Sequence, residues 1–365
     1  MRSSVFTSSL FSLVLVVILN SGFTQSVYKY DVEKVTNDVY VLKPVINDYR
    51  WVTANIAVVI NESDVLVVDT GLLPAAGYEA IKEIKKITPK PVKYVVNTHW
   101  HGDHWQGNEA FVKTYPGVEI IAAEEGARAM EMNGLVWAKQ LYVRYFQNSM
   151  IASYEKAIAE KSLSGKALTD AELQTLKEGT EQLKQDLQGM KEMKPVLPNN
   201  IFSDKLVLRK GSREIQILYL GVGNTSGDAV VYLPNEKVLI PGDLVVYPSP
   251  YESGMFSPEW LETSQKLAAL DYQVLIPGHG DVQKDHHYLN FLNAYFAEII
   301  KQVKNAYVNN GYGQPDDIKK VVTHKSVTDE LVKVAEYKGF VANLDPGFVN
   351  AAISTSYKRI IQGKK

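Results

Sequence analysis

The chain has 365 residues, of which 45% are apolar and 22% are charged, as is usual for a globular protein with a full hydrophobic core. Its formal net charge of −2 leaves no basic excess to attract a phosphate backbone, so we expect no nucleic acid partner. The chain has no cysteine, which excludes disulfides and thiolate metal sites and leaves His, Asp, Glu and Asn to hold any metal.

Residues 1–24 have the pattern of a secretory signal peptide. Arg2 precedes the apolar run LFSLVLVVIL at residues 10–19, which is short for a span of the bilayer, and small residues follow before Gln25. We therefore expect an exported protein, periplasmic or secreted, with a retained N-terminal anchor as the alternative. No later apolar run reaches membrane-spanning length, so we expect no stable membrane span once the signal is removed.

The first half of the chain alternates predicted strands with one helix. Residues 28–45 predict strands, and residues 55–71 predict a hairpin with its turn at residues 61–64. Residues 75–87 predict a helix, because three isoleucines share one face and prolines follow. Residues 92–98, VKYVVNT, predict a buried strand whose C-terminal end leads into a histidine-rich loop. In layered α/β folds, functional sites are usually built at such strand ends.

Residues 127–193 have a different composition, rich in Ala, Leu, Glu, Lys and Gln, and predict an inserted helical hairpin. Thr169, with Glu172 three residues later, predicts the N-cap of its second helix. The charges of the insertion predict a solvated face. Its aromatic residues predict either a lid over the site or ordinary packing against the body: Trp137, Tyr142, Tyr145, Phe146 and Tyr154.

The second half repeats the plan of strands that end in polar loops. Residues 214–228 predict a strand that runs into a Gly-rich loop, and residues 229–243 predict a hairpin whose second strand ends at Asp243. A further strand is predicted to end at His279, and the remaining chain is mostly helical. Two packed sheets with helices outside would bring these strand ends together. The expected organisation is a signal peptide, a main domain and a C-terminal helical extension: residues 1–24, 25–285 and 286–365.

Four side chains of metal-ligand type lie within six residues, in the sequence HWHGDH at residues 99–104. Alternation on extended backbone would project the imidazoles of His99 and His101 the same way, and Gly102 permits a sharp turn before Asp103 and His104. Imidazole and carboxylate suit a borderline ion such as zinc. Such a loop can offer ligands to two adjacent metals.

The pattern His-x-His-x-Asp-His resembles the signature of the metallo-β-lactamase superfamily, which also includes thioesterases of the glyoxalase II type and lactonases. Further resemblances follow in the family's order: VVDTG (67–71), GVGNTSGD (221–228), LIPGD (239–243) and IPGHG (276–280). The resemblance covers roughly residues 28–125 and 195–282. It implies an α/β fold of four layers, an αββα sandwich with metals at the rim between the sheets. Here the sandwich would carry an inserted helical hairpin and a helical C-terminal extension.

The resemblance also implies a set of metal ligands. His99 and His101 would hold the first metal, and Asp103, His104 and His279 the second. Asp243 would lie between the two metals.

One position departs from the family pattern. The family's third ligand for the first metal is a histidine, and this chain has Asn224 there. Asn offers only a weak neutral oxygen beside imidazole, so we expect looser binding at the first site. Substitution of the missing imidazole by His286 or His287 is a further possibility, although both are expected to open a helix.

The resemblance implies a zinc-dependent hydrolase with one or two zinc ions per chain, and the N-terminal pattern implies that this hydrolase is exported. It would cleave an ester, lactone, thioester or β-lactam bond of a small molecule by means of a metal-bound hydroxide. Asp103 and, to a lesser degree, Asp243 are the candidate catalytic residues, because they can orient the nucleophile and pass a proton. Three interpretations remain open. They are a two-metal enzyme in which Asn224 ligates weakly or through water, a one-metal enzyme, and a degenerate, non-catalytic binding protein on the same fold.

Several polar and aromatic residues near these motifs allow two interpretations each. Asp69, Thr225 and Asp228 are candidates for fixing the tautomers of the imidazoles, and the last two are equally explained as stabilising the turn of their own loop. Residues 47–51 (NDYRW), Trp100 and Trp105 would either line the substrate mouth or pack in the core. The sequence assigns no lysine or arginine to the substrate.

Overall fold

The computed structural model describes residues 28–45, 53–136, 150–251, 257–310 and 315–362. The expectations for the signal peptide, for residues 47–51 and for four aromatic residues of the insertion concern residues outside these ranges: Trp137, Tyr142, Tyr145 and Phe146. Within these ranges, no helix combines the length and the apolar character that a bilayer span requires.

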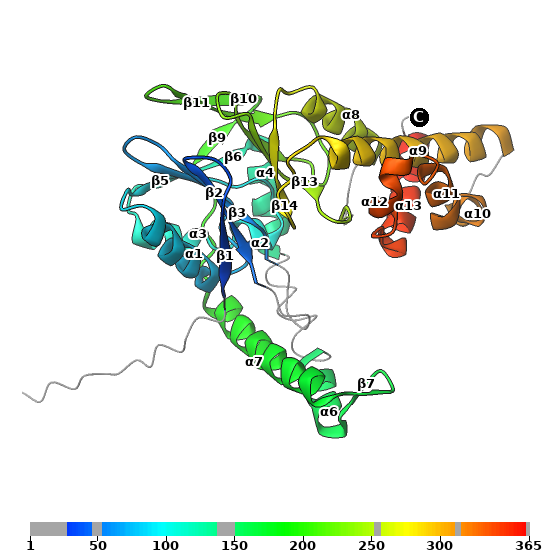
Figure 1. Ribbon diagram of the computed structural model, residues 1–365, viewed down its shortest axis with the longest axis horizontal. Helices are drawn as coiled ribbons and strands as arrows, with labels where there is room; N and C mark the ends of the chain where they lie inside the picture. Colours follow the sequence, from blue (N-terminus) through cyan, green and yellow to red (C-terminus); the bar gives the residue numbers. More distant parts are fainter. Residues whose placement is uncertain (1–27, 46–52, 137–149, 252–256, 311–314, 363–365) are drawn as a thin grey trace, which may run out of the picture.

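A seven-stranded sheet is built from the first half of the chain and one later strand, in the order β1-β2-β3-β4-β5-β6-β9 (Figure 1). The pairs from β1 to β4 are antiparallel, and the pairs from β4 through β9 are parallel. The predicted hairpin with its turn at residues 61–64 is confirmed, since Ile60 pairs with Val65. The strands are β1 Tyr30–Lys34, β2 Val39–Pro44, β3 Ile56–Ile60, β4 Val65–Val68, β5 Val92–Val96, β6 Glu119–Ala123 and β9 Asn200–Phe202.

A five-stranded sheet from the second half faces the first, in the order β10-β11-β12-β13-β14. The predicted hairpin at residues 229–243 is present, but its second strand does not end at Asp243. The buried apolar run LVV extends β13 to Val246, where it pairs in parallel with His279 of β14. The strands are β10 Lys205–Lys210, β11 Arg213–Tyr219, β12 Ala229–Leu233, β13 Val238–Val246 and β14 Val274–His279.

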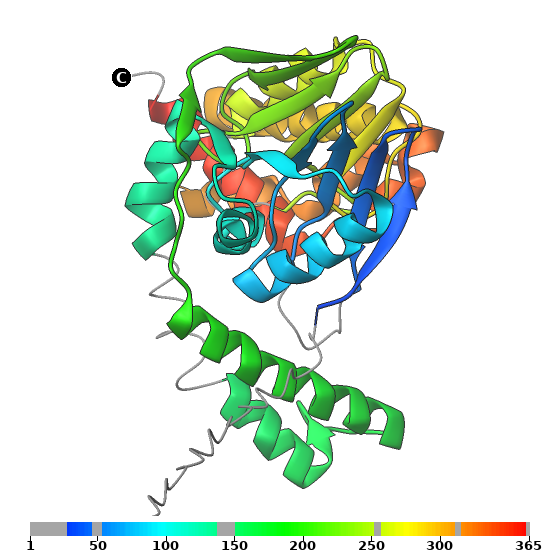
Figure 2. The ribbon, with the colours of Figure 1, turned by 90° about the vertical axis from the view of Figure 1, so that its left-hand side faces the viewer.

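The four layers of the αββα sandwich are visible in Figure 2. The two sheets share one apolar core, to which Val59 and Val68 contribute from the first sheet and Val231 and Ile240 from the second. Two helices pack on the outer face of the first sheet, α1 (Pro74–Ile87) and α3 (Asn108–Thr114). The outer face of the second sheet is covered by α8 (Ser257–Ala268) and α9 (His287–Asn310). The predicted fold class is therefore confirmed.

Helix α1 shows how the local sequence produces this packing. Pro74 occupies the first turn, where the missing N–H is no loss, and the helix ends at Ile87, just before the proline-containing segment. Ile81 and Ile84 are buried against the sheet. Each such burial contributes about 1.5–3 kcal/mol to folding.

The insertion forms a helical hairpin that projects from the sandwich as an arm (Figures 1 and 2). It consists of α6 (Met150–Glu160), α7 (Asp170–Glu192) and a two-stranded turn between them, β7 (Ser162–Leu163) and β8 (Lys166–Ala167). The predicted cap is confirmed, because Thr169 and Glu172 form a reciprocal capping box. At the base of the arm, the Tyr28 hydroxyl donates to Asp186 at 2.9 Å, which anchors α7 to the domain.

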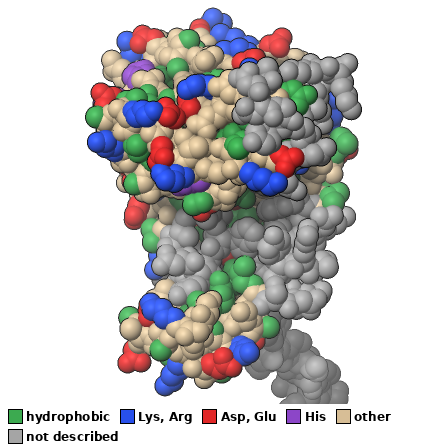
Figure 3. Space-filling model, turned by 90° about the vertical axis from the view of Figure 1, so that its right-hand side faces the viewer, with side chains coloured by type: hydrophobic (Ala, Val, Ile, Leu, Met, Phe, Trp, Pro, Cys, Tyr) green, Lys and Arg blue, Asp and Glu red, His purple; other side chains and the backbone are tan. Residues whose placement is uncertain are grey.

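The C-terminal extension is helical, as predicted, and its apolar core is continuous with that of the second sheet. Aromatic side chains of α9 form the centre of this core: Tyr288, Phe291, Tyr295 and Phe296. Figure 3 views the molecule from this side and shows acidic and basic side chains interspersed over the surface. The remaining elements are α10 Pro315–Val321, α11 His324–Leu331, the 3-10 turn η3 Ala335–Tyr337, α12 Lys338–Val341 and α13 Pro346–Gln362.

Candidate metal centre

Strand ends from both sheets meet at one rim of the sandwich. Two glycines permit this close approach. Gly242 has φ +56, and a Cβ there would lie 2.6 Å from the Thr98 side chain. A Cβ at Gly278 would collide with Asp243 Oδ1. Because only glycine fits at these positions, the chain segments that carry the predicted ligands can converge.

Two clusters of metal-ligand side chains lie at this rim. In each cluster the donor atoms all lie within 4.8 Å of one another. The short helix α2 (Gly102–Trp105) supplies two of the donors, so the predicted sharp turn is one helical turn. The first cluster contains His99, His101 and Asp243, and the second contains Asp103, His104 and His279.

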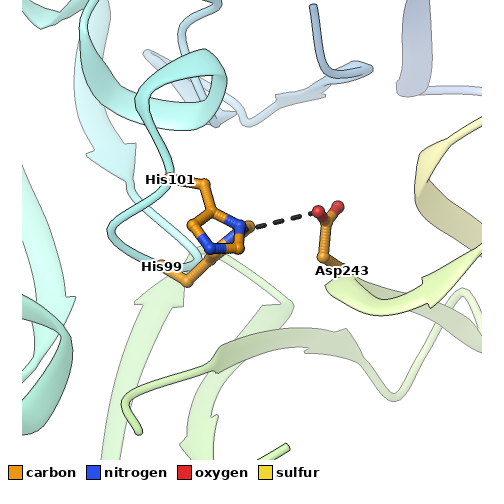
Figure 4. Close-up of side chains that lie close together, drawn as sticks. All are labelled: His99, His101 and Asp243. Atoms are coloured by element: carbon orange, nitrogen blue, oxygen red, sulfur yellow. Dashed lines mark ion pairs between the residues drawn. The ribbon is translucent and has the colours of Figure 1, made fainter. Parts of the chain in front are cut away.

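Asp243 lies between the clusters. Its Oδ2 is 3.6 Å from His99 Nε2 (Figure 4), and its Oδ1 is 3.3 Å from His104 Nε2 and 3.5 Å from His279 Nε2. The side chain is only 3% exposed. One carboxylate therefore faces both clusters, one oxygen to each, as a bridge between two cations requires.

Asp69 orients two of the imidazoles. It has φ +63 at the end of β4, and its Oδ2 lies 2.7 Å from His104 Nδ1. The Thr98 hydroxyl donates to the same oxygen at 2.9 Å, so it can only accept from His99 Nδ1, which is 3.0 Å away. Both histidines therefore present Nε2 to Asp243. The predicted role of Asp69 agrees with this geometry.

The electrostatics of the two clusters differ. Burial lowers the pKa of His99 well below its usual value, and it lowers the pKa of His101 to about 4 against the opposing effect of nearby carboxylates. Burial also opposes protonation of His104, but Asp243, Asp103 and Asp69 outweigh it and hold its pKa well above the usual value. Burial likewise lowers the pKa of His279, yet Asp243 and Asp103 raise it overall. The first pair of imidazoles is thus neutral at pH 7, whereas the second pair favours a positive charge.

The donor set fits a metal ion. Among the residues that the structure describes, four buried polar atoms of the predicted ligands have no hydrogen-bond partner: His99 Nε2, His104 Nε2, Asp243 Oδ1 and Asn224 Oδ1. An unpartnered buried polar atom costs about 1–3 kcal/mol. Three of the four atoms belong to the two clusters, and a cation bound to each cluster would satisfy them.

Asn224 stands at the departure from the family pattern and is fully buried. Its Nδ2 donates to the backbone carbonyl of Tyr251 at 2.8 Å, which leaves Oδ1 as the unpartnered atom. The Tyr251 ring in turn lies 6.4 Å from the ring of His101, edge to face. Asn224 is therefore linked to the first cluster through Tyr251, and its amide orientation is fixed by the hydrogen bond to that residue.

The structure favours one of the two interpretations for several of the remaining candidate residues. Thr225 donates to Asp228 from both its backbone N–H and its hydroxyl, at 2.8 and 3.0 Å, so this pair closes the turn of its own loop. Trp105 is fully buried and packs in the core, whereas Trp100 is half-buried with its ring 4.7 Å from that of His101.

The histidines after the last motif do not replace the missing imidazole. His286 stacks on Tyr272 with ring centroids 4.2 Å apart, and His287 starts α9 beside Asp285. Neither belongs to the clusters found in the part of the chain that the structure describes.

A cavity of about 420 Å³ opens beside His279. Its lining contains Lys43, whose ammonium lies 3.1 Å from Glu33 and 3.2 Å from Asp281. The sequence alone did not indicate this lysine, because its contact with Asp281 joins positions 238 residues apart. The lining residues are Asp31, Lys43, Pro44, Thr53, Asn55, Tyr247, His279, Gly280 and Asp281.

Comparisons with known proteins agree with this geometry. A sequence model of the metallo-beta-lactamase superfamily matches residues 49–279. A linear primary-alkylsulfatase of Pseudomonas sp. (strain ATCC 19151) is 24% identical over 287 residues, 76% of this chain and 51% of that protein. A metallo-beta-lactamase type 2 of Bacteroides fragilis is 27% identical over 120 residues, 31% of this chain and 45% of that protein. The chain thus spans about half the length of these curated relatives.

The fold resembles that of a solved sec-alkylsulfatase, Pisa1 from Pseudomonas sp.. The TM-score is 0.59 at 16% identity, and the match covers 90% of this chain and 50% of that chain. The shared fold therefore extends well beyond the segment that the superfamily model matches.

Proposed function

Because this chain belongs to the metallo-beta-lactamase superfamily, we propose that it is a metal-dependent hydrolase, that its metal is zinc and that its substrate is a small-molecule sulfate ester. The observation that carries the metal proposal is the place of Asp243 between two clusters of histidine and aspartate donors. Imidazole nitrogen and carboxylate oxygen, with no thiolate in the chain, form a donor set that suits zinc.

We propose two zinc positions of unequal affinity. His99, His101 and Asp243 would hold the first ion, with Asn224 Oδ1 as a weak further donor. Asp103, His104 and His279 would hold the second, and Asp243 would also contact it. The second position would bind more tightly, since it has two imidazoles, its own carboxylate and the shared one.

Bound zinc would supply Lewis acidity at the bond under attack and would lower the pKa of a water molecule. The chain's own residues would then accept the proton from the water and donate it to the leaving group. Asp103 is the more accessible carboxylate, with 19% of its side chain exposed, and its Oδ2 lies 3.2 Å from His279 Nε2. Burial raises the pKa of Asp103, but His104 and His279 outweigh burial and lower the pKa overall, so the carboxylate is ionised.

In the proposed step, Asp103 Oδ2 takes the proton that the attacking water loses as its oxygen bonds to the ester centre. The ester bond breaks, and the same proton passes to the leaving oxygen. Asp243 is buried with both oxygens directed at the clusters, so it would hold charge in place and would not exchange protons with solvent. The cavity beside His279 would admit the substrate.

The sulfate ester is favoured by the relative that matches most of the chain, which is named a linear primary-alkylsulfatase. Its match extends over 76% of this chain, whereas the match with the metallo-beta-lactamase of Bacteroides fragilis extends over 31%. A β-lactam is therefore the second candidate substrate. Aryl esters, lactones and thioesters remain in the test panel because the same chemistry would cleave them.

The test measures product release by the zinc-loaded full chain on dodecyl sulfate, nitrocefin, an aryl ester, a lactone and a thioester. We expect sulfate release that a chelator abolishes and that added zinc restores. Asp243→Ala should lose it, whereas Asp271→Ala, which removes an exposed carboxylate paired with Lys237, should keep it. Hydrolysis of nitrocefin alone would replace the sulfate proposal with the β-lactam one. A zinc-loaded chain that cleaves none of the five would support the degenerate binding protein.

Export remains a proposal based on residues 1–24 of the sequence. It is supported by the basic start, the short apolar run and the small residues that follow. Cell fractionation with N-terminal sequencing of the mature protein would test it. We expect an extracytoplasmic protein that begins near Gln25, and a cytoplasmic chain that begins at Met1 would contradict it.

A further inference from the structure

Tyr251 contacts both Asn224 and His101, and His101 is a member of the first cluster. Its backbone carbonyl accepts the Asn224 amide at 2.8 Å, and its ring lies edge to face with His101 at a centroid distance of 6.4 Å and an interplanar angle of 85°. Tyr251 as a residue is 42% exposed, so it lies at the surface and not in the core. A displacement of this one residue would move both neighbours.

The C-terminal helix α13 also contacts Tyr251. The Phe348 ring lies 5.0 Å from the Tyr251 ring at 75°, a favourable edge-to-face contact. The backbone N–H of Asp345 also donates to Ser249 Oγ at 3.4 Å, next to the same segment. Helix α13 is itself fixed, because Ala352 and Ile353 are fully buried in the extension's core.

The orientation of the Asn224 amide decides whether it can serve a cation. While Nδ2 donates to Tyr251, Oδ1 is the atom without a partner, and an oxygen is the atom that can ligate. A flipped amide would turn an NH₂ group toward the position of Oδ1 and repel a cation. The first position has no third imidazole to compensate, so it is the one that depends on this hydrogen bond.

We infer that Tyr251 is a positioning residue of the first metal position and that the C-terminal extension acts on this position through the contact between Phe348 and Tyr251. The inference rests on the proposed metal positions. It predicts that a change in α13, outside both clusters, alters the affinity of one metal position and leaves the other unchanged.

The test titrates zinc into metal-free full chains against a chromophoric chelator and records the visible spectrum of the cobalt-substituted proteins. The variants are Phe348→Ala and Phe348→Leu, the second of which keeps apolar volume without a ring. The matched control is Tyr337→Ala, which removes a ring of the same extension that faces Phe291 at 5.5 Å. His101→Ala identifies which of the two affinities belongs to the first position.

We expect both Phe348 variants to weaken the first position about tenfold, as loss of an orienting partner does, with the second position unchanged. The cobalt band of the first position should shift in these variants and not in Tyr337→Ala. Wild-type affinities and spectra in Phe348→Leu would overturn the inference and leave the metal proposal intact. Equal weakening in Tyr337→Ala would overturn it too, since general loosening of the extension would then suffice. Failure of the wild type to bind zinc would remove the metal proposal itself.

Discussion

Asp69 Oδ2 lies 2.7 Å from His104 Nδ1, and both side chains are almost fully buried. This contact fixes the imidazole so that Nε2 points to Asp243, 3.3 Å away. The same carboxylate also accepts from the Thr98 backbone N–H at 2.8 Å and from its hydroxyl. One side chain at the end of β4 thus orients donors of both clusters.

Asp69→Asn should weaken zinc binding about 10–100-fold, because an amide accepts less well from Nδ1–H and its NH₂ opposes Thr98. Zinc titration of the metal-free variant measures this. Asp64→Asn is the matched control, since Asp64 is a buried carboxylate at the other end of the same strand, paired with Lys210 at 2.9 Å. The control should lose stability and keep zinc affinity. Equal zinc affinity in both variants would contradict the role of Asp69.

Asp103→Asn should lower kcat about 10²–10⁴-fold at saturating zinc, because the amide cannot take the proton that the attacking water loses. Steady-state kinetics on whichever substrate the panel identifies provide the measurement. Asp271→Asn serves as the control for loss of an exposed carboxylate. If Asp103→Asn retains wild-type kcat once zinc is saturating, the proposed proton acceptor is wrong.

Gly278→Ala should abolish binding at both metal positions. A Cβ there would collide with Asp243 Oδ1 and with the backbone of Gly242 and Asp243, and it would push the shared carboxylate away from the clusters. Metal content after zinc dialysis, together with a circular dichroism spectrum, tests this. Gly339→Ala in α12 is the control, since a Cβ there meets nothing within 4 Å. A folded Gly278→Ala protein with two bound zinc ions would show that Asp243 is not needed where we place it.

Much of the fold could be predicted from the sequence, because the strands and α1 carry their signals locally. The pattern of residues 55–71 predicts the hairpin, and the spacing of the isoleucines in α1 predicts its buried face. The predicted end of β13 at Asp243 is wrong, because the buried apolar run after Asp243 continues the strand to Val246. In the structure, the positive φ of Gly242 is accommodated as an irregularity within the parallel pairing.

Only part of the site could be predicted from the sequence, again because only some of its residues carry a local signal. Four ligand-type residues in six positions are a local signal, and the order of the later motifs indicated Asp243 and His279. The position of Lys43 in the cavity and the contacts of Tyr251 and Phe348 had no such signal, because each depends on segments far apart in the chain. The choice between two functions for Thr225 and Asp228 also required coordinates, since either role uses the same residues.

Zinc uptake at pH 7 should release protons, and the apparent affinity should fall as the pH is lowered. In the metal-free protein the neighbouring carboxylates outweigh burial and raise the pKa of His104 and His279, so these imidazoles carry protons that zinc must displace. His99 and His101 have lowered pKa values and are already neutral. Isothermal titration calorimetry in two buffers of different ionisation enthalpy counts the protons. The same apparent enthalpy in both buffers would contradict the assigned charges.

The most direct test of the two-metal centre is an anomalous difference map, recorded at the zinc edge from crystals of the full chain grown with zinc. We predict two peaks, one on each side of the Asp243 carboxylate. The first would lie among His99, His101 and Asp243, and the second among Asp103, His104 and His279. A map with no peak within these side chains, or with zinc only at other places on the surface, would contradict the account.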